Sequence, residues 1–219
     1  MGTAEPGARV ALVTGAAGEV AGAIIERLQA DGFRVAGLDD ADAGAGDLPI
    51  AVDVTDRNQV VAAAERVARQ LGPISVLVTA PYLYDGAPFG EMSAERWDRL
   101  LRTHLGGTTN ACAAVVPDMV RVGRGTVVAL SSWLAFAGVA GEAYQAAATG
   151  SILAFIKSFA VEVAPRGVRV NCIAVGPLDA TPPGASVRPA EIADTVAFLV
   201  NDGDHFVGQV LEAAAGAVV

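Results

Sequence analysis

The chain has 219 residues, of which 53% are hydrophobic and 18% are charged, and its formal net charge is −9 at pH 7. This length is sufficient for one domain with a sizeable core. The acidic balance and the scattered basic residues argue against a nucleic-acid partner. The two histidines, His104 and His205, are too few and too far apart for a histidine-based metal site.

The sequence also argues against a membrane or secreted protein. Every apolar stretch of the length needed for a membrane span, about 18 residues, contains a charge or a turn signal. The first residues, Met1–Arg9, lack the apolar segment of a secretory signal. The two cysteines, Cys112 and Cys172, lie in apolar stretches and are expected to be buried free thiols. We therefore expect a cytoplasmic protein without a membrane partner.

Strand-like and helix-like stretches alternate along the whole chain, which predicts a parallel sheet with helices on both faces. The expected fold is α/β: a single doubly wound Rossmann-type domain over residues 1–219, with a mostly parallel seven-stranded sheet. The expected strands are Val10–Thr14, Arg34–Leu38, Ile50–Val54, Ser75–Thr79, Gly125–Ser132, Val168–Val175 and Gly208–Ala213. The expected helices are Gly18–Asp31, a helix capped by Thr55-Asp56 that ends at Leu71, Ser93–Val122 with a break near Gly106-Gly107, a long helix from Tyr144, and Ala190–Val200.

The fifth strand and the helix after it carry a recognisable pattern. The strand ends in Ser131-Ser132, and Tyr144 opens the next helix twelve residues after Ser132. This order resembles the active-site segment of the short-chain dehydrogenase/reductase family, and the resemblance extends from Val10 to Val219. In that family the Ser polarises a carbonyl, the Tyr donates or accepts a proton, and a Lys one helical turn later completes the set. Ser132 and Tyr144 match this pattern, but the Lys position is Ala148.

The resemblance implies that the missing Lys affects the two reaction directions unequally. The pKa of an unaided phenol is about 10, so abstraction of a proton at neutral pH is slow while donation is still available. The family has an Asn in the helix after the fourth strand, and His104 falls on that position. This histidine either relays protons to Tyr144 or fills the Asn niche with a hydrogen bond, and both interpretations stay open. The candidate catalytic residues are Ser132, Tyr144 and His104.

The stretch Thr14–Gly18 follows a strand and opens a helix, as a dinucleotide-binding loop does. Gly15 and Gly18 are its candidate cofactor-binding residues. On the family pattern, Glu19 and Ala21 occupy the second and third glycine positions. A glutamate there adds bulk and negative charge beside a pyrophosphate, so the loop is expected to be damaged but not abolished.

Three further positions resemble cofactor contacts of the family. Asp39 ends the second strand, where a carboxylate accepts the ribose hydroxyls and favours NAD over NADP. Asp53-Val54 matches the adenine-contacting pair, and Gly176 matches the Gly of the Pro-Gly that follows the sixth strand. Both aspartates are equally explained as turn residues. Thr79-Ala80-Pro81-Tyr82 departs from the family pattern near the nicotinamide, so binding of NAD(H) is expected to be weak or absent.

Three functions remain open on the sequence. The first is NAD(H)-linked reduction or oxidation of a small carbonyl or hydroxyl substrate with a degenerate active site. The second is a cofactor-independent dehydratase, cyclase or lyase that uses Ser132, Tyr144 and His104 as acid/base groups. The third is a non-catalytic subunit of a hetero-oligomer. The resemblance otherwise implies a homodimer or homotetramer, and the family base rate places the first function ahead.

Overall fold

The computed structural model describes residues 9–40, 45–178 and 186–214. The strands are β1 (Val10–Thr14), β2 (Arg34–Asp39), β3 (Leu48–Ala51), β4 (Ile74–Thr79), β5 (Gly125–Ser132), β6 (Val168–Val175) and β7 (Val210–Ala213). The helices are α1 (Glu19–Ala30), α2 (Arg57–Gln70), α3 (Ala94–Leu101), α4 (Gly107–Val122), α5 (Ala143–Val163) and α6 (Pro189–Asn201). Short 3-10 turns are η1 (Phe89–Glu91), η3 (Trp133–Ala135) and η4 (Ala164–Arg166), and η2 (Arg102–Gly106) is a π-helical turn.

The strands form one seven-stranded sheet in the order β3-β2-β1-β4-β5-β6-β7. Every pairing in this sheet is parallel. The predicted doubly wound sheet is therefore confirmed, and "mostly parallel" becomes fully parallel for the described strands. The strand order reverses between β1 and β4, and in such sheets ligands bind beyond the carboxyl ends of the strands at this switch point.

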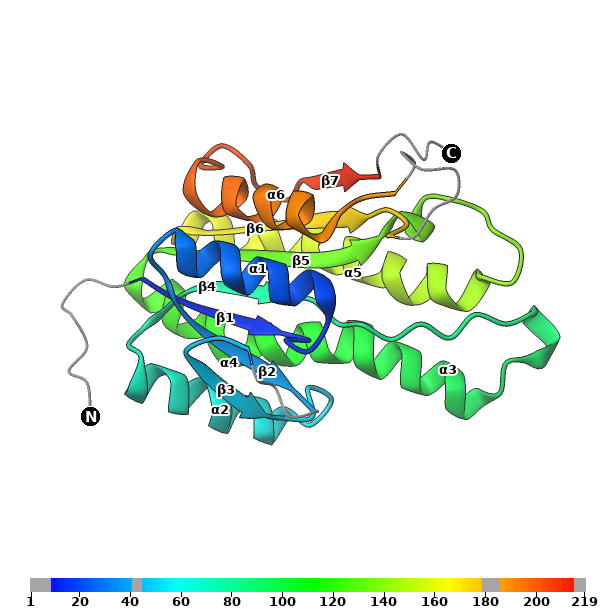
Figure 1. Cartoon of the computed structure of the whole chain (residues 1–219), viewed down its shortest axis with the longest axis horizontal. Coiled ribbons are helices and arrows are strands. Elements are labelled where there is room, and N and C mark those ends of the chain that lie inside the picture. Colours follow the sequence, from blue (N-terminus) through cyan, green and yellow to red (C-terminus); the bar gives the residue numbers. More distant parts are fainter. Residues whose placement is uncertain (1–8, 41–44, 179–185, 215–219) are drawn as a thin grey trace.

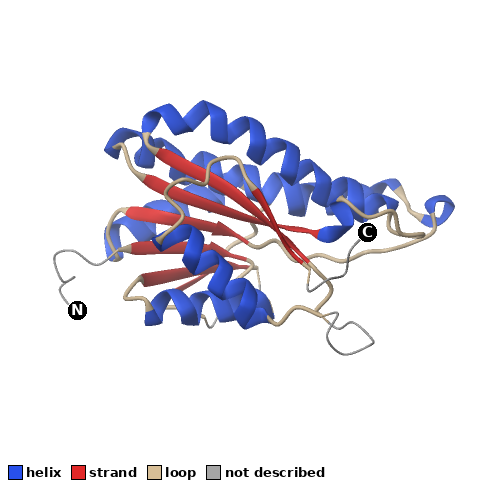
Figure 2. Ribbon diagram, turned by 90° about the horizontal axis from the view of Figure 1, so that it is seen from above, coloured by secondary structure: helices blue, strands red, loops and turns tan. Residues whose placement is uncertain are grey.

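Helices cover both faces of the sheet (Figures 1 and 2). Residues of α1 and α6 form one buried cluster with one face of the strands, and residues of α2, α4 and α5 form another with the opposite face. The helix α3 and the loop before it extend past the carboxyl ends of the strands (Figure 1). The central strands are therefore packed on both faces. The loops that could form a site lie at the carboxyl edge of the sheet.

Several boundaries differ from the sequence-based prediction by a few residues, and two of these differences have a clear local cause. The third strand begins earlier and ends at Ala51, because the Asp53 carboxylate accepts hydrogen bonds from the Thr55 amide (2.8 Å) and hydroxyl (2.7 Å) and so forms a turn. The expected break near Gly106-Gly107 takes the form of the π-helical turn η2, which joins α3 to α4. Such wide turns inside helices often occur at functional sites.

One helical segment, Ala143–Arg166, is long and apolar enough to cross a membrane by length and composition alone. This segment is α5 with its terminal turn, and it packs on β5 and β6. Its residues Ile152 and Ile156 are fully buried in the protein core. Packing against the sheet therefore accounts for the apolar residues on the inner face of this helix.

Arg169 of β6 ties the sheet to the carboxyl end of α6. Its guanidinium donates to the main-chain carbonyls of Leu199 (2.9 Å) and Gly203 (2.8 Å) and to the Thr126 hydroxyl (3.0 Å). The last carbonyls of a helix have no partner within the helix, so a buried cation placed there satisfies them. Only 15% of the Arg169 side chain is exposed, and burial lowers its pKa.

We predict that Arg169→Met lowers the free energy of unfolding by about 2–4 kcal/mol, because it leaves several buried acceptors without a donor. The matched control is Arg121→Met, since that side chain is 73% exposed and pairs with Asp118 on the surface. The control should change stability by about 1 kcal/mol or less. Urea unfolding followed by circular dichroism measures both, and equal effects would refute the capping role.

Candidate functional site

The turn after β1 lies at the switch point of the sheet. Gly15 has a φ of +70°, and a Cβ added to it would overlap the main-chain carbonyl of Ala80, which follows β4. The Ala80 amide donates to the Thr14 carbonyl at 3.3 Å. Only glycine therefore fits at position 15, and the loops that follow β1 and β4 meet in close backbone contact at the switch point.

Two main-chain amides of the loop between Gly15 and α1 already donate hydrogen bonds within the protein. The Ala17 amide donates to an Asp39 carboxylate oxygen at 2.9 Å, and the Gly18 amide donates to the Gly15 carbonyl at 3.0 Å. Gly18 precedes the helix in an extended conformation, and Glu19 is its first residue. The first amides of a helix have no intrahelical acceptor and attract anions. This geometry can hold a phosphate group at the start of α1, although the exposed Glu19 carboxylate lies in the same helical turn.

The structure places Asp39 beside this loop, whereas the two other adenine-side candidates make local contacts. The Asp53 carboxylate forms the turn described above, and the Val54 carbonyl accepts a hydrogen bond from the side-chain Nδ2 of Asn110 at 3.0 Å. The Gly176 amide donates to the Ala213 carbonyl of β7 at 2.8 Å. The turn and the sheet therefore account for these three positions, and Asp39 is the candidate best placed to contact a ribose.

The three catalytic candidates lie on elements that meet at the carboxyl edge. Ser132 ends β5, and its hydroxyl accepts from the Leu134 amide at 3.2 Å. Tyr144 lies in the first turn of α5, and its hydroxyl donates to the Phe89 carbonyl at 3.1 Å. The Tyr144 ring stacks on Phe89, with centroids 5.4 Å apart, and packs obliquely on Trp97. Within the described residues, no hydrogen bond joins the side chains of Ser132, Tyr144 and His104 to one another.

His104 is buried in the π-helical turn, where only 4% of it is exposed. Its Nε2 lies 2.8 Å from the Leu83 carbonyl, which is an acceptor, so this nitrogen carries the proton. Burial lowers the pKa of His104, and the hydrogen bond to the Leu83 carbonyl raises it by less. Of the two interpretations, this geometry favours a neutral His104 that binds the loop after β4. It does not favour a proton relay to Tyr144.

Gln145 is a site residue that sequence reasoning missed. Its amide nitrogen donates to the Leu83 carbonyl at 3.1 Å and lies 3.4 Å from Nε2 of His104. The amide is buried, and its oxygen has no hydrogen-bond partner among the described residues. A glutamine at the start of an otherwise apolar helix was the available signal. Ala148, at the position that the resemblance assigns to Lys, is fully buried.

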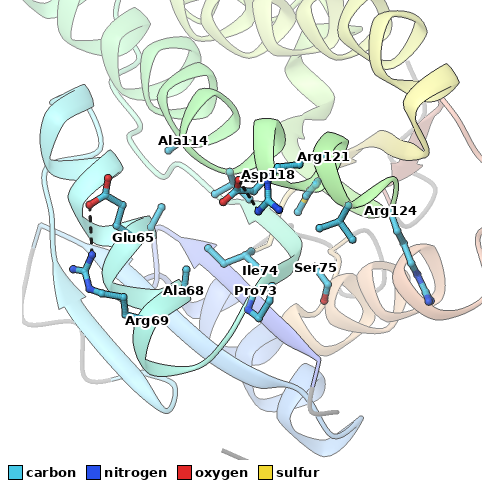
Figure 3. Close-up of a pocket in the computed structure, with 14 residues that line it drawn as sticks. Glu65, Ala68, Arg69, Pro73, Ile74, Ser75, Ala114, Asp118, Arg121 and Arg124 are labelled. Carbon is cyan, nitrogen blue, oxygen red and sulfur yellow. Dashed lines mark hydrogen bonds and ion pairs between the residues drawn. The ribbon is translucent and has the colours of Figure 1, made fainter. Parts of the chain in front are cut away.

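Two cavities lie away from this edge. One of about 340 Å³ lies between α2 and α4 at the amino end of β4, where the ion pairs Glu65–Arg69 and Asp118–Arg121 flank it (Figure 3). The other, of about 320 Å³, lies between α4 and α5 and is lined by Phe155. Neither contains a candidate site residue. Across residues 9–40, 45–178 and 186–214, no three His, Cys, Asp or Glu side chains are grouped to hold a metal ion.

We predict that His104 makes stability depend on pH. The unfolded chain binds a proton at His104 near the ordinary value of 6.5, whereas the folded chain stays neutral to lower pH because its pKa is lowered. Stability is therefore complete above about pH 7 and falls as the pH is lowered through 6.5 toward the folded pKa. Urea unfolding at about pH 7.5 and pH 5 should show a smaller loss for His104→Asn than for the wild type.

The control for this measurement is His205→Asn, because His205 is the other histidine and is exposed. This variant should keep the wild-type pH dependence. An unchanged dependence in His104→Asn would show that other groups determine it.

Residues 9–192 match the family model described as short chain dehydrogenase. The chain is 31% identical to the 3-oxoacyl-[acyl-carrier-protein] reductase of Thermotoga maritima over 189 residues, which cover 78% of this chain and 77% of that one. It is 32% identical to the cis-4-hydroxycyclohexanecarboxylate dehydrogenase of Sinomonas cyclohexanicum, with 91% and 92% of the chains covered. The ligand-free aldohexose dehydrogenase of Thermoplasma acidophilum has a similar structure, with a TM-score of 0.88 at 26% identity over 95% of this chain and 93% of that chain.

These matches bear out the resemblance found in the sequence, and the chain belongs to the short-chain dehydrogenase family.

Proposed function

We propose that the protein is an NAD(H)-linked oxidoreductase that interconverts a small carbonyl compound and the corresponding alcohol. The observation that carries this proposal is the close approach of the two loops at the switch point. Gly15 lies against the Ala80 carbonyl, and the Asp39 carboxylate at the end of β2 accepts a hydrogen bond from the Ala17 amide. These residues fit the adenosine and phosphate half of a dinucleotide, and a carboxylate at position 39 repels a 2′-phosphate, which favours NAD over NADP.

Bound NADH supplies a hydride to the substrate carbonyl, and the chain supplies the polar groups around it. Ser132 is proposed to polarise the carbonyl oxygen with its hydroxyl, and Tyr144 is proposed to donate the proton that completes the alcohol. A neutral phenol is already the acid form, so this direction needs no nearby cation. Since Ala148 replaces the family Lys, reduction is favoured over oxidation, which needs the phenolate.

The family and the named matches favour redox chemistry over the two alternatives. The relatives are described as a reductase and as dehydrogenases, whose substrates carry a carbonyl or hydroxyl group. No contact among the described residues specifically favours an elimination or a non-catalytic role. The departures at Glu19 and Ala148 make weak cofactor binding part of the proposal.

We also infer a homodimer or homotetramer in the cytoplasm. The cavity between α4 and α5 opens on the outer side of the two long helices, where the resemblance places subunit contacts. Val161 of α5 is 74% exposed, as a residue covered by a second subunit would be in an isolated chain. The buried free thiols Cys112 and Cys172 fit a reducing compartment.

The test of the function is a titration with NADH and NADPH, followed by a screen of small ketones and aldehydes. We expect NADH to bind more tightly than NADPH. We also expect Tyr144→Phe to reduce NADH-dependent turnover by about 100-fold or more, the usual contribution of a positioned acid, while leaving NADH binding unchanged. Absence of NADH binding at millimolar concentration would refute the proposal.

We further predict that Glu19 weakens cofactor binding through its charge. Glu19→Gln should tighten NADH binding by about three- to tenfold at low salt, because the carboxylate competes with a pyrophosphate at the start of α1. Glu26→Gln is the matched control, since Glu26 is an exposed residue of the same helix further from its first turn. Equal effects of the two substitutions would show that only net charge matters. Fluorescence titration of NADH at two salt concentrations separates these outcomes.

A further inference from the structure

The loop segment Leu83–Phe89 is bound at several points by the start of α5, by the residues just before it and by η2. The Leu83 carbonyl accepts from His104 and Gln145, and the Ala87 amide donates to the Gly141 carbonyl at 2.9 Å. The Phe89 carbonyl accepts from the Tyr144 hydroxyl at 3.1 Å. This segment therefore lies against the same helical turn that carries the proposed acid.

The pair Tyr84–Glu142 fixes the middle of the segment. The Tyr84 hydroxyl donates to Oε1 of Glu142, the residue immediately before α5. The second carboxylate oxygen of Glu142 is buried and has no other partner among the described residues. A Cβ at Gly86 would lie 2.8 Å from the Tyr84 hydroxyl oxygen and from Oε1 of Glu142, so a side chain at this position would displace the pair. Hydrogen bonding to Glu142 raises the pKa of Tyr84, which stays a donor at neutral pH.

The contact with Phe89 excludes the proposed reaction while it lasts. The Tyr144 hydroxyl has one hydrogen, and it is donated to a main-chain carbonyl, the same chemical group as the carbonyl of a ketone or aldehyde substrate. A substrate oxygen and the Phe89 carbonyl cannot both accept this hydrogen in good geometry. The segment and a substrate therefore compete for one donor.

We propose that Tyr84 and Glu142 are positioning residues that hold Leu83–Phe89 on the first turn of α5 and so keep the Tyr144 hydroxyl on the Phe89 carbonyl until a carbonyl substrate displaces it. The proposal depends on the proposed function in one respect only, which is that the molecule displacing the Phe89 carbonyl is a carbonyl substrate. When a binding-competent state is partly populated, the apparent dissociation constant rises by the inverse of its population. Weakening the Tyr84–Glu142 pair should thus lower KM and leave kcat unchanged, a split that simple loss of structure does not produce.

The test compares Tyr84→Phe with the control Tyr82→Phe. Each variant loses one phenolic oxygen from the same loop, but Tyr82 is 77% exposed and its hydroxyl makes no hydrogen bond within the described part of the chain. Hydrogen exchange of the Ala87 amide reports release of the segment. The rate at which N-acetylimidazole acetylates the Tyr144 hydroxyl, measured by peptide mass spectrometry, reports release of the phenol. Neither readout requires turnover.

We expect Tyr84→Phe to accelerate both rates by about three- to tenfold, the factor expected for loss of one hydrogen bond, and Tyr82→Phe to leave both unchanged. Glu142→Ala should match Tyr84→Phe, and Glu142→Gln, which keeps an acceptor oxygen, should restore most of the protection. The side chain of Glu142 makes no capping hydrogen bond to α5, so its removal leaves the helix start intact.

Unchanged exchange at Ala87 in Tyr84→Phe would overturn the proposal, and so would faster exchange without faster acetylation of Tyr144. Where a carbonyl substrate is turned over, a fall in kcat without a fall in KM would also overturn it. Absence of NADH-dependent turnover in every variant would count against the proposed function alone, because the exchange and acetylation rates still decide the role of the pair.

Discussion

The site depends on the pairing of β5 with β6. The two strands pair in parallel from Gly125 with Val168 to Ser132 with Val175, the longest register in the sheet. Parallel neighbours need a crossover that returns the chain to the amino edge, and α5 is that crossover. Its first turn must therefore lie at the carboxyl edge, next to the end of β5. The positions of Ser132 and Tyr144 at one edge follow from this constraint and not from a contact between the two side chains.

The same constraint explains why the side chains at this edge bind mainly to the main chain of the loop after β4. The long loop after β4 also begins at the carboxyl edge, and its main-chain groups need partners there. His104, Gln145 and Tyr144 supply them from the π-helical turn and the start of α5. The family resemblance assigns two of these residues to chemistry. In the structure both residues bind the loop, so the stability of the loop and the availability of the Tyr144 hydrogen are coupled.

The fold could be predicted from the sequence because the pattern that indicates each strand and helix lies within a short stretch and recurs along the chain. Apolar strands of β-branched residues alternate with stretches of helical periodicity, and β6 was expected around Val168–Val175, where the structure has it. The short edge strand β3 was placed too late because its end is set by a side-chain turn at Asp53. The places of Gly15 after β1 and of Asp39 at the end of β2 followed from the strand pattern, and their roles toward a cofactor stay predictions. The Tyr84–Glu142 bond could not be predicted, because it joins residues 58 positions apart and no periodic pattern marks either one. The one sequence signal for Gln145 was its place at the start of an otherwise apolar helix.

The buried Ala148 and the hydrogen bond from Tyr144 to the Phe89 carbonyl both favour the protonated form of the Tyr144 phenol. A cation near the phenol stabilises the phenolate, and a full-sized Lys does not fit the closed space around Ala148 without repacking. The bond to the Phe89 carbonyl exists only while Tyr144 carries its hydrogen, because a phenolate cannot donate. The surroundings of Tyr144 thus retain the proton that the proposed reduction would consume, whereas the anion that oxidation would require could not form this bond. A carbonyl substrate that replaces Phe89 would meet a donor that is already protonated and already oriented toward a carbonyl oxygen.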